Sequence, residues 1–236
     1  MLRRRDVGYL VVEAQTLSEN STDDPDDKHW YYAGARYTER SFAPYALAIG
    51  QAALAWNSLQ ESMGGVFWAL MGGHLGVGQP LAVWQSPKAD RPKRDMLQAA
   101  YKGLPKTFDE AFPKARADLD WIVNAVNTLE DARNNVVHAP LSMTVPLRAF
   151  KTLGPRTSGK SKREIPKEAK VVAQDWMMNS RARRISSKHL LTEIRWCRST
   201  AIVIRDFSDA ITAALRYKEA PWPDRPALPN RGQTKN

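Results

Sequence analysis

An arginine, an amide and a histidine lie within six residues of one another, as Arg133, Asn134 and His138. Glu130, Asn134 and His138 are each four residues apart, so on a helix these three side chains would share one face. Imidazole exchanges protons near neutral pH, and a guanidinium stabilises negative charge on a carboxylate or phosphate. The combination suits acid–base chemistry on an anionic substrate.

The same residues also allow a structural interpretation. Arg133 could pair with Glu130 or Asp131, and a histidine near a helix C-terminus interacts favourably with the helix dipole. However, Arg133 occupies the next position of an apolar stripe, where a guanidinium is costly unless it is paired or faces a ligand or partner. The stripe comprises Leu119, Ile122, Val126, Leu129 and Val136. Both interpretations stay open at this point.

The stripe predicts an amphipathic helix that carries all of these residues. Thr107 and Glu110 have the spacing of a capping box and predict that this helix starts near them, with Pro113 in or near its first turn. We expect the helix to run to His138, because Pro140 biases the preceding residue away from helical geometry.

Other segments with helical periodicity must position this motif. Residues 42–71 carry apolar residues in steps of three and four, and residues 187–215 do the same and include Cys197, which we interpret as a packing residue. A short helix is expected at 81–85. A helix at 91–101, capped by Asp90, is expected to point Lys93 and Arg94 toward water or RNA. Together these segments predict an all-α bundle.

Asn57 and Glu61 lie beside the apolar stripe of the first long helix and are four residues apart. They therefore face the same way. We take Asn57, Glu61 and Glu130 as second-rank candidates for the site, the alternative being that Asn57 and Glu61 form a solvated surface pair.

The composition limits the class of protein. The chain has 236 residues, 43% of them hydrophobic and eight of them Trp, which is enough for a domain with a true core. Its single cysteine excludes an intrachain disulfide and favours a reducing compartment. No apolar segment is long enough to span a membrane, and no Cys/His/Asp cluster has metal-ligand spacing. We therefore expect a cytoplasmic protein without a metal or other cofactor.

The positive charge is concentrated after the motif. Residues 1–140 contain 15 Lys and Arg against 17 Asp and Glu, whereas residues 141–236 contain 20 against 8. Such asymmetry indicates a polyanionic partner such as RNA, although a solvated basic face is the alternative. Residues 143–150 and 169–178 have strand character and predict a basic β-hairpin within an insertion at 141–186. Its candidate RNA-binding residues are Lys151, Arg156, Lys160, Lys162 and Arg163.

The two ends of the chain differ from its centre. Residues 1–40 form an extension that we expect to be partly irregular, with a short strand at 7–12. Four prolines, at 221, 223, 226 and 229, exclude a helix near the C-terminus, and we expect residues 218–236 to be disordered.

Residues 133–138, Arg-Asn-Asn-Val-Val-His, resemble the Arg-polar-x-x-x-His motif of HEPN domains, a family named for higher eukaryotes and prokaryotes nucleotide-binding. The resemblance covers about residues 41–217 and implies an antiparallel helical bundle. It also implies a homodimer in which two motifs form one composite active site, because many HEPN proteins are metal-independent ribonucleases of this kind. Some toxin members carry a tyrosine two residues after the histidine, where this chain has Pro140, and Ala139 is a milder departure.

Three functions follow from these observations. The first is a metal-independent endoribonuclease in a toxin–antitoxin or phage-defence setting, with RNA as substrate and an antitoxin as a further partner. It would use the 2′-hydroxyl as nucleophile and leave a 2′,3′-cyclic phosphate, with catalytic residues Arg133, Asn134 and His138. The second is a non-catalytic RNA-binding or scaffold HEPN protein. The third is a helical interaction protein without a nucleic-acid role.

Overall fold

A computed structural model of the chain describes residues 29–31, 42–72, 78–138, 141–146, 170–173, 187–217 and 219–231. This part of the chain is mostly helical, as the sequence predicts for an all-α protein. Its helices are α1 (Ala43–Met71), α2 (Gly78–Gln85), α3 (Asp90–Lys102), α4 (Lys106–Ala111), α5 (Ala115–His138) and α7 (Ser187–Arg216).

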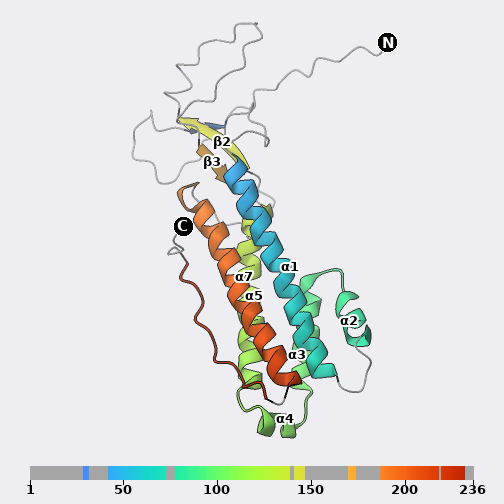
Figure 1. The fold of residues 1–236 in the computed structure, drawn as a ribbon. Helices are drawn as coiled ribbons and strands as arrows, with labels where there is room; N and C mark the ends of the chain where they lie inside the picture. Colours follow the sequence, from blue (N-terminus) through green and yellow to red (C-terminus); the bar gives the residue numbers. More distant parts are fainter. Residues whose placement is uncertain are drawn as a thin grey trace, which may run out of the picture.

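Three long helices, α1, α5 and α7, form an elongated bundle (Figure 1). α1 and α7 lie side by side and run in the same direction, and Gly65 of α1 lies against the side chain of Thr212 of α7. α5 runs in the opposite direction, and the shorter α3 flanks α1 and α5. The end of α5 that carries the motif therefore lies beside the starts of α1 and α7.

The apolar stripes predicted from the sequence form the core. Trp56, Leu59 and Met63 of α1 are almost completely buried, and the stripe residues of α5 and α7 pack against them. Cys197 belongs to this core, as predicted. A smaller cluster lies at the motif end and consists of Ala48, Ala52, Val136, Leu190 and Ile194. Arg133 lies on α5 between the two clusters in sequence, since Leu129 and Ala132 belong to the first and Val136 to the second.

The start of the motif helix differs from the prediction. Residues 106–111 form the separate helix α4, whose N-cap is Pro105, and α5 begins only at Ala115. Thr107 and Glu110 thus lie inside α4 and do not cap α5. Pro113 falls between the two helices, where its missing N–H and fixed φ favour a break. The end of α5 at His138 is as predicted.

Three short strands form a sheet next to the motif end of the bundle: β1 (His29–Tyr31), β2 (Leu141–Pro146) and β3 (Lys170–Ala173). β2 lies in the middle and pairs antiparallel with both neighbours, His29 opposite Pro146 and Leu141 opposite Ala173. β2 and β3 fall within the insertion predicted at 141–186. The residues between them, and the strand predicted at 7–12, lie outside the described residues.

The C-terminal segment contradicts the prediction of disorder. Residues 219–231 turn back from the end of α7 and follow the bundle in an extended course toward its motif end (Figure 1). Trp222 and Leu228 pack against the main core. The prediction failed because proline prevents helix formation without preventing an ordered extended conformation.

No helix in the described part of the chain is both long enough and apolar enough to cross a membrane.

Candidate functional site

Arg133 is held between α5 and α1. Its Nη1 donates a hydrogen bond to Oδ1 of Asn134 at 2.8 Å, and its guanidinium carbon lies 5.4 Å from the centre of the Trp56 ring. The side chain is half-buried. Its Nε has no hydrogen-bond partner among the described residues. Two of the three predicted catalytic residues, Arg133 and Asn134, thus contact each other directly.

Trp56 is in turn fixed by α3. The indole is only 2% exposed, and its Nε1 donates a hydrogen bond of 2.9 Å to Oδ2 of Asp90. A cation over an indole ring is stabilised electrostatically, more so when water is excluded. Asp90, Trp56 and Arg133 therefore connect α3, α1 and α5. Sequence reasoning placed Trp56 in the core and Asp90 at a helix cap, and neither residue gives a signal of this contact.

Glu130 has a different partner from the one that the structural interpretation offered. It forms an ion pair with Arg94 of α3, whose Nε also donates to Oδ1 of Asn127 at 2.7 Å. Arg94 is 1% exposed, so the prediction that it faces water or RNA is wrong. Buried arginine needs such partners, because an unpaired buried charge is very costly. Among the described residues, no carboxylate forms an ion pair with Arg133.

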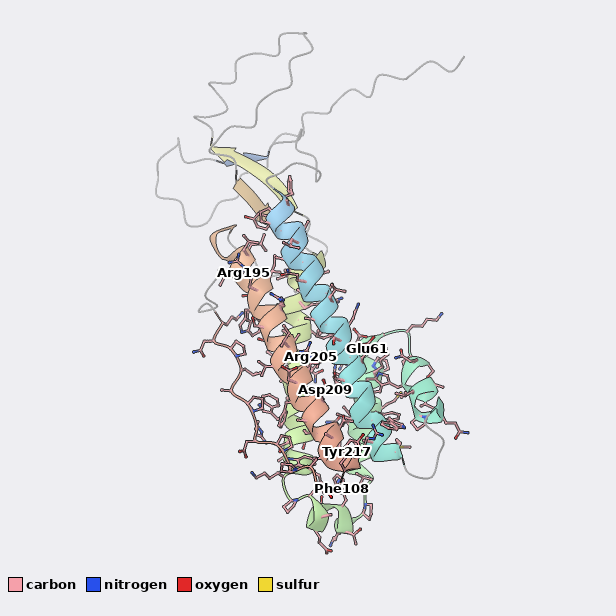
Figure 2. The ribbon with its side chains drawn as sticks, in the orientation of Figure 1. Glu61, Phe108, Arg195, Arg205, Asp209 and Tyr217 are labelled. Carbon is pink, nitrogen blue, oxygen red and sulfur yellow. The ribbon has the colours of Figure 1, made fainter. Side chains whose placement is uncertain are left out.

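Asn57 and Glu61 are exposed on α1, where Figure 2 labels Glu61. Neither forms a hydrogen bond or ion pair with another residue that the structure describes, and Trp56, their neighbour, points inward to Arg133. The structure thus brings Glu130 into contact with α3 and leaves Asn57 and Glu61 on the surface.

His138 is the last residue of α5, five positions after Arg133. Its side chain lies outside the described residues, as do Lys151, Arg156, Lys160, Lys162 and Arg163. No group of three or more His, Cys, Asp or Glu side chains in the described ranges could hold a metal ion.

Cys197 of α7 lies close to the motif, but its thiol is unreactive at neutral pH. Burial, followed by the nearby charge of Glu193, raises the pKa of its thiol to about 12, while the charges of Arg231 and Arg133 lower it. A thiol with such a pKa is a poor nucleophile at neutral pH. Its environment shows that Arg133 and the C-terminal Arg231 both lie within electrostatic range of the same side chain.

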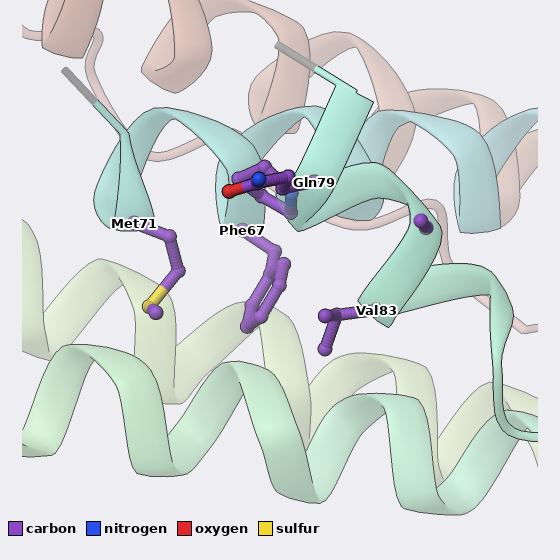
Figure 3. A pocket seen from close by; sticks show the side chains of 6 residues that line it. Phe67, Met71, Gln79 and Val83 are labelled. Carbon is purple, nitrogen blue, oxygen red and sulfur yellow. The ribbon is translucent and has the colours of Figure 1, made fainter. Parts of the chain in front are cut away.

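A separate hollow of about 420 Å³ lies at the far end of α1, between α1 and α2 (Figure 3). Its lining includes Phe67, Met71, Gln79 and Val83 and carries no ionisable side chain. Among the described residues there is therefore no side chain to perform acid–base or anion chemistry at this hollow.

The arrangement around Arg133 provides a half-buried guanidinium, held by the Trp56 ring and by Asn134, that lacks a carboxylate partner among the described residues. A guanidinium in this state can bind a phosphate or another anion. Comparisons of the chain with protein-family models, with curated proteins and with solved structures found no match.

Proposed function

We propose that this protein is a metal-independent endoribonuclease of HEPN type. The observation that carries the proposal is the state of Arg133, whose half-buried guanidinium lies over Trp56 and has an amide but no carboxylate as its partner among the described residues. A positive charge in such a place is costly unless an anion uses it. His138 follows on the same helix and supplies a group that titrates near neutral pH.

The proposed reaction uses the nucleophile that RNA itself contains. The 2′-oxygen attacks the adjacent phosphorus while the bond from phosphorus to the 5′-oxygen breaks, which leaves a 2′,3′-cyclic phosphate and a 5′-hydroxyl. His138 takes the proton of the 2′-hydroxyl, and Arg133 stabilises the charge that develops on the phosphate oxygens. Asn134 holds the guanidinium through its hydrogen bond.

The leaving 5′-oxygen needs a proton from a second acid. We propose that His138 of a second copy supplies it, in a two-fold symmetric homodimer with a composite site. The basic residues at 151–163 would hold the RNA backbone, so affinity should fall steeply with salt. The proposed setting is a cytoplasmic toxin–antitoxin or phage-defence system.

Cleavage of end-labelled single-stranded RNA in the presence of EDTA tests this function. The wild-type protein should produce fragments with cyclic-phosphate ends, and His138→Ala should reduce the rate at least a thousandfold. His74→Ala is the matched control, because it removes a histidine outside the motif and should leave the rate unchanged. Equal cleavage by His138→Ala and wild type would contradict the proposal.

A non-catalytic RNA-binding protein is the second candidate. The Trp56 ring and Asn134 fix Arg133 on both sides, and such a rigid guanidinium suits phosphate binding as well as catalysis. In this case RNA would bind in a salt-sensitive way without cleavage. Arg133→Met would weaken the binding, whereas His138→Ala would not.

A further inference from the structure

The C-terminal segment 219–231, called the strap below, contacts the bundle through every third residue. The side chains that form these contacts are Trp222, Arg225, Leu228 and Arg231. A period of three is that of the polyproline II helix, which the prolines at 221, 223, 226 and 229 favour. The strap therefore presents one face to the bundle, as a bound proline-rich peptide does.

One end of the strap is fixed on α5. Asp118, whose side chain is only 4% exposed, accepts hydrogen bonds of 2.8 Å from Nε1 of Trp222 and from Nε of Arg225. The guanidinium of Arg225 lies 5.9 Å from the centre of the Trp121 ring. Trp222 also packs against Phe112, with ring centres 5.5 Å apart. We call this set the α5 clasp.

The other end is fixed on α7 by a second set of the same kind, the α7 clasp. Glu193 accepts two hydrogen bonds from Arg231, one of them from Nε at 3.1 Å. Arg231 lies 5.0 Å from the centre of the Trp196 ring, and Nε1 of Trp196 donates to the carbonyl oxygen of Pro229 at 2.9 Å.

Each clasp uses an acid three residues before a tryptophan on its helix, Asp118 with Trp121 and Glu193 with Trp196. Residues three apart on a helix are neighbours, so each pair offers a carboxylate beside an aromatic face. Between the clasps Leu228 borders a hollow of about 250 Å³ that Trp121 and Trp196 also line. The two arginines of the strap are six residues apart, a spacing that two turns of a polyproline II helix would span in about 19 Å.

We propose that the groove between α5 and α7 is a binding site for extended proline-rich peptides with two arginines six residues apart, and that the strap occupies it as an intramolecular ligand. Aromatic-lined grooves recognise proline-rich segments because the preformed helix loses little entropy on binding. The two carboxylates select arginine at the matching positions. A second peptide must displace the strap, whose effective concentration is about millimolar for a short connection.

The test uses the full-length chain and a fluorescein-labelled synthetic peptide of residues 219–231. A variant with Arg225→Glu and Arg231→Glu should release its own strap and bind the peptide at least tenfold more tightly than wild type does. A control peptide with the same two substitutions should not bind. Equal affinity of wild type and variant for the native peptide, or no binding by a folded variant, would overturn the proposal.

Limited digestion of the wild-type protein gives a second readout that does not depend on the variant folding. Within the strap trypsin can cut only after Arg231, because Arg225, the other basic residue there, precedes Pro226 and resists cleavage. Cutting requires Arg231 to leave Glu193, so an excess of unlabelled, protease-resistant peptide 219–231 should accelerate it about tenfold. An unchanged rate at millimolar peptide would contradict an exchangeable strap.

Discussion

The clasps and the motif end of α5 use the same contact, an arginine over a tryptophan, in two different electrostatic states. Arg225 and Arg231 lie over Trp121 and Trp196 and are neutralised by Asp118 and Glu193. Arg133 lies over Trp56, but within the described part of the chain its hydrogen bond goes to an amide and not to a carboxylate. The charges of the clasp arginines are therefore balanced within the described part of the chain, whereas the charge of Arg133 has no carboxylate partner there.

The buried Arg94 belongs with the clasps in this comparison, since its charge is paired with Glu130 and its Nε donates to Asn127. Arginines with acidic partners should matter for stability, because their loss leaves a buried carboxylate unpaired. Arg133 should matter for binding or catalysis and little for stability.

The largest effect on stability is expected at Arg94. Arg94→Met removes the partner of Glu130 and the donor to Asn127, and should lower the free energy of unfolding by about 3 kcal/mol in urea denaturation. The exposed Arg91 on the same helix is the control. Arg91→Met should change the free energy of unfolding by less than about 0.5 kcal/mol. Equal effects of the two substitutions would contradict the assignment of Arg94 as a structural residue.

A smaller loss is expected at the α5 clasp. Asp118→Asn removes the charge that Arg225 and Trp222 share and should cost about 2 kcal/mol. Asp224→Asn provides the control, since that side chain is 97% exposed and its ion pair with Lys114 is open to solvent. A clasp that contributes nothing would give the same unfolding midpoint for both variants.

Cys197 lies within electrostatic range of both Arg133 and Arg231, and its thiol makes the stability of the protein depend on pH. Its pKa is raised from 9.0 to about 12 by burial, so the folded protein holds its thiol proton more tightly than the unfolded chain does. The resulting stability is fully present below pH 9 and is lost as pH rises toward 12, with about 1 kcal/mol lost by pH 10. Urea midpoints from pH 8 to 10.5 should fall more steeply for wild type than for Cys197→Ala. Parallel curves would show that the thiol does not contribute.

The smallest effect on stability is expected at Arg133. Arg133→Met keeps the apolar contact with Trp56 and removes a charge that has no carboxylate partner among the described residues. The free energy of unfolding should therefore change by less than about 1 kcal/mol. A loss comparable to that of Arg94→Met would place Arg133 among the structural arginines.

The sequence predicted the long helices well because their apolar residues recur at helical spacing over several turns, as in Trp56, Leu59 and Met63 of α1. The prediction that Arg94 faces water or RNA was wrong, because hydrophobic periodicity does not reveal that a charged residue has a partner on another helix. Asp90, Arg94, Leu97 and Tyr101 share one face of α3, and this spacing was the available signal.

The strap was also readable in part. Among the prolines, a large side chain recurs every third residue, at Trp222, Arg225, Leu228 and Arg231. This spacing is expected of a polyproline II segment that packs one face against a surface, and it is not expected of a disordered segment. The partners of these side chains could not be predicted, because Asp118 and Glu193 are far from the strap in the sequence. The contact of Arg133 with Trp56 was hidden for the same reason, although its position on the apolar stripe already marked it as exceptional.

One paired measurement tests the central claim, that Arg133 is kept for an anion and not for the fold. Cleavage of labelled RNA in EDTA and unfolding in urea are measured on wild type, Arg133→Met and the control Arg91→Met. Arg133→Met should lose cleavage while its unfolding midpoint stays close to that of wild type. Unchanged cleavage together with a large loss of stability would contradict it.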